Sequence, residues 1–552
     1  MSFTVIPHDK VAFETQLILK NLLPTLDSSN RCQEIIYDHH RFDYNLFQDR
    51  IARLANILNR IGIEAGDTVA ILDWDSHRYL ECFFAIPMLG AILHTVNVRL
   101  SIEQILYTIN DASDKVILIH QDFVPIAEKI IDRVTTVSKW ILLQDDANSF
   151  ESSIDFHGEY EKLLENSSNV IRFPEFDEKV PATTFYTTGT TGDPKGVCFS
   201  HRQLVIHTFG LASALSKSNA HGQFTKEDIY MPLTPMFHVH AWGMPYVATL
   251  LGVKQVYPGR YDIAKIISLI GREGVTFSHC VPTILHMLLN APEAKYADFT
   301  RWKVIIGGAA LSPDLARQAL DRGIDVFGGY GMSETCPVLT LAQMGKEHLQ
   351  LPIEEQLYFR CKAGRPLSMV DLRIVDDNME DLPHDGRTIG EVVVRAPWLA
   401  QGYTNNPAES KLLWRRDYLH TGDLGHIDEW GYLKVTDRLK DVIKSGGEWI
   451  SSLLLEDLAT NCRHVSEAAV IALPDDKWGE TPLLLITVNS DEELEIMELR
   501  KIFEKAAADG VIASWAVPNR VEIVSDIPKT SVGKVDKKLL RLQYSSSELD
   551  RI

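Results

Sequence analysis

The stretch Thr184–Gln203, TFYTTGTTGDPKGVCFSHRQ, decides the fold. Apolar residues lead into a loop of threonines and glycines, after which Val197–Phe199 resume a strand. Ser200 and Gln203 then form the capping-box pattern that begins a helix. Glycines let backbone N–H groups turn toward an anion, threonine hydroxyls add further donors, and Lys195 adds a positive charge. The segment therefore predicts a loop that binds phosphate.

This loop is not a Walker A motif. Pro194 stands where a Walker A loop has its second glycine, and Gly196 stands where it has Ser or Thr. The alternative is a flexible hairpin without a ligand, which the combination of threonines, glycines and a lysine disfavours. We expect nucleotide phosphates to be bound by Thr187, Thr188, Gly189, Thr190, Thr191, Gly192 and Lys195.

Alternating helix and strand patterns surround the loop. Residues 44–60 place apolar side chains at helical spacing, and Gly62 closes that helix. Residues 67–73 are typical of a buried strand, and residues 78–89 of a second helix. Further short strand patterns occupy residues 115–120, 139–143, 255–257 and 304–306. The alternation predicts layered α/β subdomains whose sheets are largely covered.

The second half of the chain changes character at two places. From Gly364, strands separated by Asp, Asn and Gly turns predict a β-rich subdomain over about residues 364–437. The strands expected there are residues 371–376, 390–395 and 432–436. Beyond Arg438, residues 440–447 are expected to lead into a helix at 451–460, strands at 468–473 and 482–488, and a helix at 494–507. We therefore expect a large N-terminal domain over residues 1–439 and a small α+β C-terminal domain over residues 440–552.

Composition narrows the class of protein. The 552 residues suffice for two or more domains, and 45% hydrophobic with 24% charged residues is typical of a soluble globular chain. The formal charge of −20, from 75 acidic and 55 basic residues, disfavours nucleic acid and anionic lipid as partners. Seven scattered cysteines without a C-x-x-C pair disfavour a disulfide framework or a zinc site. With no signal peptide or membrane-spanning run in the sequence, we expect a cytoplasmic protein.

Six motifs, in the same order, resemble those of the adenylate-forming superfamily of acyl-CoA synthetases, firefly-type luciferases and peptide adenylation domains. They are the loop at residues 187–196, Pro235–Trp242 (acyl pocket), Gly328–Thr335 (adenine and magnesium), His420–Asp423 (ribose), Asp437–Glu448 (hinge) and Pro528–Lys534 (catalytic lysine). Thr188 stands where many members have Ser, and Ser333 where many have Thr, so both positions keep a hydroxyl. The resemblance spans nearly the whole chain and is strongest to fatty-acyl-CoA synthetases.

The resemblance implies a site for ATP. Beyond the loop, the nucleotide-binding residues that it implies are Gly308, Gly329, Tyr330, Ser333, Thr335, Asp423 and Arg438. Tyr330 would present its ring to adenine, and Asp423 would accept hydrogen bonds from the ribose hydroxyls. Glu334, with Thr188, would hold the Mg²⁺ that carries ATP phosphates. Outside the glycine-rich frame, Tyr330 would be read as a core residue and Glu334 as a surface carboxylate.

The acyl-pocket residues implied in the same way are His238, Trp242, Gly308 and Ala309, with His238 also beside the reacting groups. His238 and His240 form an H-x-H pair, but without an identified third ligand a metal site is disfavoured. No Asp occurs between Pro235 and Trp242, which disfavours amino acids as substrates. The alternative for Trp242 is an ordinary packed core residue.

The C-terminal motifs imply a lid that rotates. Lys534 would serve adenylation and Lys440 would be the hinge, while Lys444 would serve thioester formation. The path of coenzyme A would pass Gly446, Gly447 and Trp449. On spacing alone, Lys534 would be one more lysine of a basic tail.

The expected activity uses ATP, Mg²⁺ and coenzyme A to turn a carboxylic acid into acyl-AMP and then acyl-CoA. A medium- or long-chain fatty acid is the first choice of substrate, and an aryl or short thio-substituted acid the second. A luciferase-like oxygenase and a nucleotide-binding module without turnover are alternatives from other classes, although Lys534 together with Glu334 disfavours the latter. Family members are often dimers, so a homodimer is compatible with the resemblance.

Overall fold

The computed structural model describes residues 15–24, 33–146, 151–187, 193–217, 221–445, 448–475, 478–488, 496–530 and 535–546. Within these ranges, no helix is long and apolar enough to cross a lipid bilayer. The helices are α1 (Tyr44–Arg60), α2 (His77–Met88), α3 (Ile102–Asp111), α4 (Val124–Ile130), α5 (Tyr160–Glu165), α6 (His201–Leu215), α7 (Val239–Trp242), α8 (Met244–Leu250), α9 (Ile263–Glu273), α10 (Pro282–Asn290), α11 (Pro313–Asp321), α12 (Lys346–Leu349), α13 (Ile353–Arg360), α14 (Pro407–Leu413), α15 (Ser452–Thr460), α16 (Ile496–Ala508) and α17 (Lys537–Ser546).

The largest sheet is mainly parallel. Its strands lie in the order β16 (Arg365–Pro366), β15 (Val338–Leu341), β14 (Asp325–Gly331), β13 (Lys303–Ile306), β12 (Phe277–Cys280), β10 (Ile229–Pro232), β11 (Lys254–Tyr257), β1 (Glu34–Tyr37) and β2 (His40–Asp43). From β12 to β14 the pairing is parallel, so the carboxyl ends of these strands meet at one edge. The strands expected at residues 255–257 and 304–306 are confirmed as β11 and β13, each one residue longer at its start.

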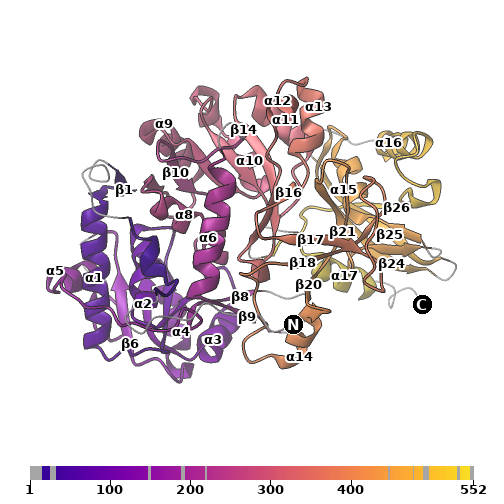
Figure 1. Ribbon diagram of the computed structural model, residues 1–552. Helices are drawn as coiled ribbons and strands as arrows, with labels where there is room; N and C mark the ends of the chain where they lie inside the picture. The colour runs from indigo at the N-terminus through magenta and orange to yellow at the C-terminus, as the bar shows by residue number, and fades with distance from the viewer. Residues whose placement is uncertain are drawn as a thin grey trace, which may run out of the picture.

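A second, seven-stranded sheet carries the phosphate loop. Its order is β7 (Gly158–Glu159), β6 (Lys139–Leu143), β5 (Asp114–His120), β3 (Thr68–Leu72), β4 (Ile92–Thr95), β8 (Pro181–Thr187) and β9 (Lys195–Ser200). The edge strands β8 and β9 form an antiparallel hairpin that leads into α6, the magenta helix in the middle of Figure 1. The capping box predicted for Ser200 and Gln203 is confirmed at the start of α6.

Helix α1 shows how local sequence specifies an element here. It spans Tyr44–Arg60, as the apolar spacing predicts, and Asp43 caps it by accepting a hydrogen bond from Leu46 N. Its buried face includes Phe47 and Leu54, which pack in the main core. Gly62 follows with φ of 88°, a left-handed conformation that favours glycine and ends the helix.

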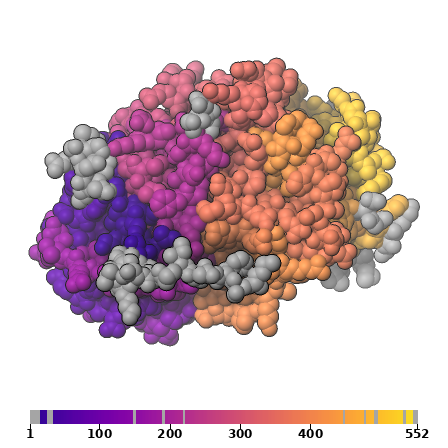
Figure 2. Space-filling model, viewed as in Figure 1, coloured from indigo at the N-terminus to yellow at the C-terminus, as the bar shows by residue number. Residues whose placement is uncertain are grey.

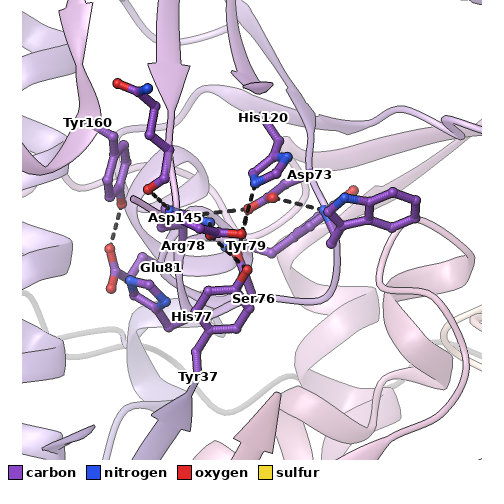
Figure 3. A network of polar contacts seen from close by, with 12 residues as sticks. Tyr37, Asp73, Ser76, His77, Arg78, Tyr79, Glu81, His120, Asp145 and Tyr160 are labelled. Atoms are coloured by element: carbon purple, nitrogen blue, oxygen red, sulfur yellow. Dashed lines mark hydrogen bonds and ion pairs between the residues drawn. The ribbon is translucent and has the colours of Figure 1, made fainter. Parts of the chain in front are cut away.

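A buried polar network joins the two large sheets (Figure 3). Tyr37, at the end of β1, donates its hydroxyl to Asp145, which follows β6, at 2.8 Å. Arg78 of α2 donates to the same carboxylate at 2.6 Å, and His120 Nε2 lies 3.1 Å from it. The Arg78 side chain is 0% exposed, so this network belongs to the interior.

The second half of the chain forms two smaller sheets. The β-rich part contains β17 (Asp371–Val375), β18 (Gly390–Arg395), β20 (Tyr418–Ile427) and β19 (Trp414–Arg415), with β21 (Leu433–Arg438) paired to β20. The C-terminal sheet contains β23 (Glu448–Ile450), β22 (Ile443–Ser445), β25 (Gly479–Val488) and β24 (Val465–Asp475), with β26 (Arg520–Ile523) paired to β25. Figure 2 shows the orange β-rich residues between the purple N-terminal part and the yellow C-terminal elements.

One segment of the C-terminal part differs from the expectation. Residues 440–447 were expected only to lead into a helix, but β22 and β23 form a hairpin there. Each of these strands has three residues and carries too little alternation for a strand signal. Helix α15 begins just beyond the hairpin, where Ser452 Oγ donates to Asp437 of β21 at 2.8 Å.

Candidate active site

The predicted motifs meet at the carboxyl edge of the nine-stranded sheet. Residues 233–242 follow β10, residues 307–309 follow β13, and Glu334 lies just beyond the end of β14. Loops at the carboxyl ends of parallel strands form the crevice in which α/β sheets bind ligands. The topology therefore brings the acyl-pocket and nucleotide motifs to one place.

The neck of the phosphate loop is held by the hairpin of β8 and β9. Thr187 pairs with Lys195, so the loop leaves the sheet and returns to it at one point. Gly196 lies against Thr404, because a Cβ on this glycine would stand 3.0 Å from Thr404 Cβ, and Thr404 N donates to Gly196 O at 2.8 Å. The other predicted phosphate-binding residues, Thr188, Gly189, Thr190, Thr191 and Gly192, lie outside the described residues.

Asp423 forms the centre of a second cluster. Tyr330 OH donates to Asp423 Oδ2 at 2.7 Å, and Arg438 Nε lies 3.0 Å from Asp423 Oδ1. Asp423 and Arg438 face each other across β20 and β21, so the sheet register holds the pair. The attraction of Asp423 raises the pKa of Arg438 above its ordinary value, and Glu334 also contributes. A buried carboxylate of this kind is suited to accept hydrogen bonds from sugar hydroxyls.

Glu334 links this cluster to the phosphate loop. Its side chain is buried, and Oε1 accepts a hydrogen bond from Tyr403 OH at 2.6 Å. The ring of Tyr403 lies 5.1 Å from Lys195 Nζ, at the loop neck. Tyr403 thus connects Lys195 to Glu334, and the charge of Glu334 also contributes to the raised pKa of Arg438, the partner of Asp423.

The donor set fits Mg²⁺ that arrives with a nucleotide. Magnesium in nucleotide sites keeps several waters and is held by one or two carboxylates plus substrate phosphates. Glu334 supplies one such carboxylate beside the phosphate loop. Among the described residues, no group of three or more His, Cys, Asp and Glu side chains could hold a metal by itself.

Neighbouring residues of the same motif have different positions. Ser333 is half-buried, next to Glu334. Thr335 is fully buried, and its hydroxyl accepts from Met332 N at 3.0 Å and donates to Pro337 O at 2.5 Å. Thr335 therefore holds the turn that presents Glu334, and its contact with nucleotide stays a prediction.

The acyl-pocket motif ends in a left-handed turn. Residues 239–242 have φ values of 47°, 55°, 47° and 59°, a conformation that costs L-residues roughly 1–2 kcal/mol each. Trp242 packs on Gly307, where a Cβ would stand 2.8 Å from the indole, and its ring centre lies 5.0 Å from that of His279. Local strain of this kind concentrates at functional sites. The contacts with Gly307 and His279 place Trp242 between the ends of β12 and β13, within the crevice.

The other residues of this pocket differ in exposure. His238 is half-buried, whereas Gly308 and Ala309 are exposed beyond the end of β13. His240 is fully buried, and neither of its ring nitrogens has a hydrogen-bond partner among the residues that the structure describes. Burial lowers the pKa of His240 to about 3, so it is a neutral core residue in the fold.

The predicted lid residues lie around the junction with the C-terminal part. Trp449 is exposed and lines a cavity of about 180 Å³, together with Val442 and Trp515. Lys444 is exposed on β22, opposite Trp449, and Lys440 is exposed in the turn before it. The remaining predicted lid residues, Gly446, Gly447 and Lys534, lie outside the described residues.

Sequence analysis missed three residues that hold the site. Tyr403 and Glu409 contact its charged groups, but a tyrosine in a polar loop and a glutamate in the first turn of a short helix carry no local signal. Asp75 accepts hydrogen bonds from Met236 N and Tyr261 OH, both at 2.8 Å, and so anchors the acyl-pocket motif. Its position directly after the buried strand β3 is a signal that could have pointed to it.

Comparisons with known proteins identify the family of this chain. The AMP-binding enzyme family model matches residues 28–404, and the AMP-binding enzyme C-terminal domain model matches residues 454–534. A long-chain-fatty-acid–CoA ligase of Thermus thermophilus is 39% identical over 511 residues, covering 92% of this chain and 91% of that protein. A 3-methylmercaptopropionyl-CoA ligase of Ruegeria pomeroyi is 37% identical over 500 residues, covering 90% of each chain. The crystal structure of ATP-bound MatB from Rhodopseudomonas palustris has a TM-score of 0.81 at 25% identity, covering 96% of this chain and 99% of that one. This chain belongs to the AMP-binding enzyme family.

Proposed function

We propose that this enzyme joins a medium- or long-chain fatty acid to coenzyme A through an acyl-adenylate. The observation that carries the proposal is that Tyr403 contacts both Lys195 and Glu334, while the charge of Glu334 also acts on Arg438, the partner of Asp423. This supports a nucleotide site with its phosphates at Lys195 and its ribose at Asp423. The acid–thiol ligase class follows from family membership, and the 39% identical long-chain-fatty-acid–CoA ligase supports this class of acid.

In the first step, a carboxylate oxygen of the acid attacks the α-phosphorus of ATP, and pyrophosphate leaves. Two anions must approach each other, so the site has to neutralise charge and align the attack. We assign the phosphates to Lys195 and the loop, the ribose to Asp423 with Arg438, and the reacting carboxylate to Lys534. Mg²⁺ held by Glu334 and Thr188 would supply further neutralisation of the phosphates.

In the second step, the thiol of coenzyme A attacks the acyl carbon, and AMP leaves. Pyrophosphate has to leave before the thiol enters, so one protein face can hardly serve both steps. We propose that residues 440–552 form a C-terminal domain that rotates about Lys440 and exchanges Lys534 for the hairpin with Lys444 and Trp449. Closure of this kind excludes water from the reactive mixed anhydride.

A second candidate substrate is a short thio-substituted acid, with an aryl acid as a further alternative. The 37% identical 3-methylmercaptopropionyl-CoA ligase favours the thio-substituted acid. In either case we place the acid beside His238, Trp242, Gly308 and Ala309. We also propose that the enzyme works in the cytoplasm, and a homodimer is compatible with its family.

The test is AMP release that depends on coenzyme A, measured with acids of graded chain length from butyrate to palmitate and with 3-methylmercaptopropionate. The proposal expects kcat/KM to be highest for a medium- or long-chain acid. A maximum at 3-methylmercaptopropionate would replace the fatty acid by the second candidate. Oxygen uptake with a luciferin, without thioester formation, would instead indicate a luciferase-like oxygenase.

A further inference from the structure

Two residues outside the predicted motifs contact the charged groups of the phosphate site. We propose that Tyr403 and Glu409 are positioning residues that keep Lys195 and Glu334 apart from each other and available to ATP. This inference rests on the proposed function, because it takes ATP to be the ligand of the site.

Both residues lie on Gly402–Ser410, which we call the strap. The strap is fixed to the loop neck, since Thr404 N donates to Gly196 O at 2.8 Å. It is also folded on itself, because Tyr403 N donates to Ser410 Oγ at 2.8 Å. Its second half begins α14, the orange helix at the lower edge of Figure 1, which carries Glu409. The strap is therefore an ordered support of the phosphate loop.

Each charged group of the site has its own partner on the strap. Lys195 Nζ lies 2.5 Å from Glu409 Oε2 and 5.1 Å from the centre of the Tyr403 ring. The hydroxyl at the other end of Tyr403 donates to Glu334 Oε1 at 2.6 Å. Tyr403 thus presents an aromatic face to the ammonium and a hydrogen-bond donor to the carboxylate.

The position of Tyr403 opposes a direct ion pair between Lys195 and Glu334. An ammonium and a carboxylate in one partly buried site attract each other strongly, and a direct pair would draw Lys195 away from the loop neck and leave Glu334 with less charge to offer a cation. With the ring of Tyr403 between them, Lys195 pairs with Glu409, and Glu334 is oriented by a neutral hydroxyl. Glu334 therefore stays available to a cation, and Lys195 stays at the loop neck.

The competing explanation is that the strap only packs the fold. Tyr403 would then be a partly buried aromatic residue, and Glu409 a solvated helix residue with a surface ion pair. A structural role of this kind predicts that substitutions lower thermal stability and all kinetic parameters together. A positioning role predicts separate effects on nucleotide and on Mg²⁺.

The experiment compares Tyr403→Phe and Glu409→Gln in the full chain, with Lys411→Gln, an exposed charge on the same helix, as the matched control. Calorimetry measures the Kd of ATP with and without Mg²⁺, and pyrophosphate release measures the KM of the acid. Tyr403→Phe is expected to weaken binding of ATP with Mg²⁺ by about 3- to 10-fold and to leave Mg²⁺-free ATP unchanged, because it acts through Glu334. Glu409→Gln is expected to weaken both by a similar factor, because it acts through Lys195.

Specific outcomes would overturn the proposal. Equal losses in every parameter, with a lower Tm, would assign the strap a packing role, and tighter ATP binding by Glu409→Gln would make Glu409 a competitor of ATP. Wild-type affinities in both variants would also refute it. If the unaltered enzyme binds no ATP, the proposed function itself fails, which is a different result.

Discussion

The junction between the two large sheets and the predicted phosphate site both combine cations with carboxylates, but their charged side chains differ in exposure to solvent. At the junction, the side chains of Arg78 and Asp73 are 0% exposed, and Tyr37 and His120 complete the network (Figure 3). Although burial opposes it, hydrogen bonding from His120 and attraction to Arg78 hold the pKa of Asp145 well below its ordinary range.

At the phosphate site, the side chain of Lys195 remains 18% exposed and that of Glu409 39% exposed. Water reaches these groups, so a substrate anion can reach Lys195 as well. Removing one partner of a closed buried pair leaves a stranded charge, whereas an exposed group is resolvated. The comparison indicates that buried charges paired within the protein stabilise the fold, whereas partly exposed charges remain accessible to a ligand.

The largest expected effect comes from a substitution in the buried polar network between the two large sheets. Arg78→Met should lower the free energy of unfolding by about 3–5 kcal/mol, because it strands the buried carboxylate of Asp73 and removes a partner of the half-buried Asp145. The control is Arg395→Met, which removes an exposed partner of Asp371 and should cost about 1 kcal/mol or less. Denaturant unfolding measures both, and similar losses in the two variants would contradict the distinction.

The next effect concerns a charge assigned to catalysis. Lys534→Ala should slow acyl-AMP formation by on the order of 10²-fold or more, because the reacting anions lose a positive charge. It should largely spare thioester formation from supplied acyl-AMP. Pyrophosphate release and thioester formation are measured separately, and equal loss in both half-reactions would exclude two alternating faces of the lid.

A smaller effect tests Asp423, the predicted ribose carboxylate, which is buried but paired with the partly exposed Arg438. Asp423→Asn should weaken ATP binding by about 10- to 100-fold, because charge-assisted hydrogen bonds are lost. Stability should change little, since Arg438 retains solvent access. Calorimetry with ATP and thermal unfolding give the two values. A large drop in Tm with unchanged affinity would place Asp423 among the structural charges.

The smallest effect concerns the buried side chain of His240. Burial lowers the pKa of His240 to about 3, so between pH 6.5 and 3 the unfolded chain binds a proton that the folded chain does not. This residue therefore makes the fold less stable as pH falls through that window. His240→Phe should remove roughly 1–2 kcal/mol of the loss between pH 7 and 5, as measured by denaturant unfolding at each pH. Parallel curves for wild type and variant would show that His240 does not titrate in this way.

Local sequence was sufficient where one segment supplies the whole signal. The helix at residues 44–60 and the capping box of Ser200 and Gln203 were predicted at their observed positions, because spacing and caps are local. The hairpin at residues 443–450 was missed, since three-residue strands depend on their partners. The left-handed turn at residues 239–242 was also missed, because Val239, Ala241 and Trp242 are residue types that rarely adopt positive φ.

By itself, the sequence determined the order of the six motifs and the family, since these depend on residue types at short spacings. Only the tertiary structure decided that Tyr403 contacts both Lys195 and Glu334 and that Arg438 lies beside Asp423. These contacts join segments far apart in the chain, and sheet register and loop packing set their distances. The sequence shows which residues are charged, but the fold decides which of them are buried in ion pairs and which stay accessible to a substrate.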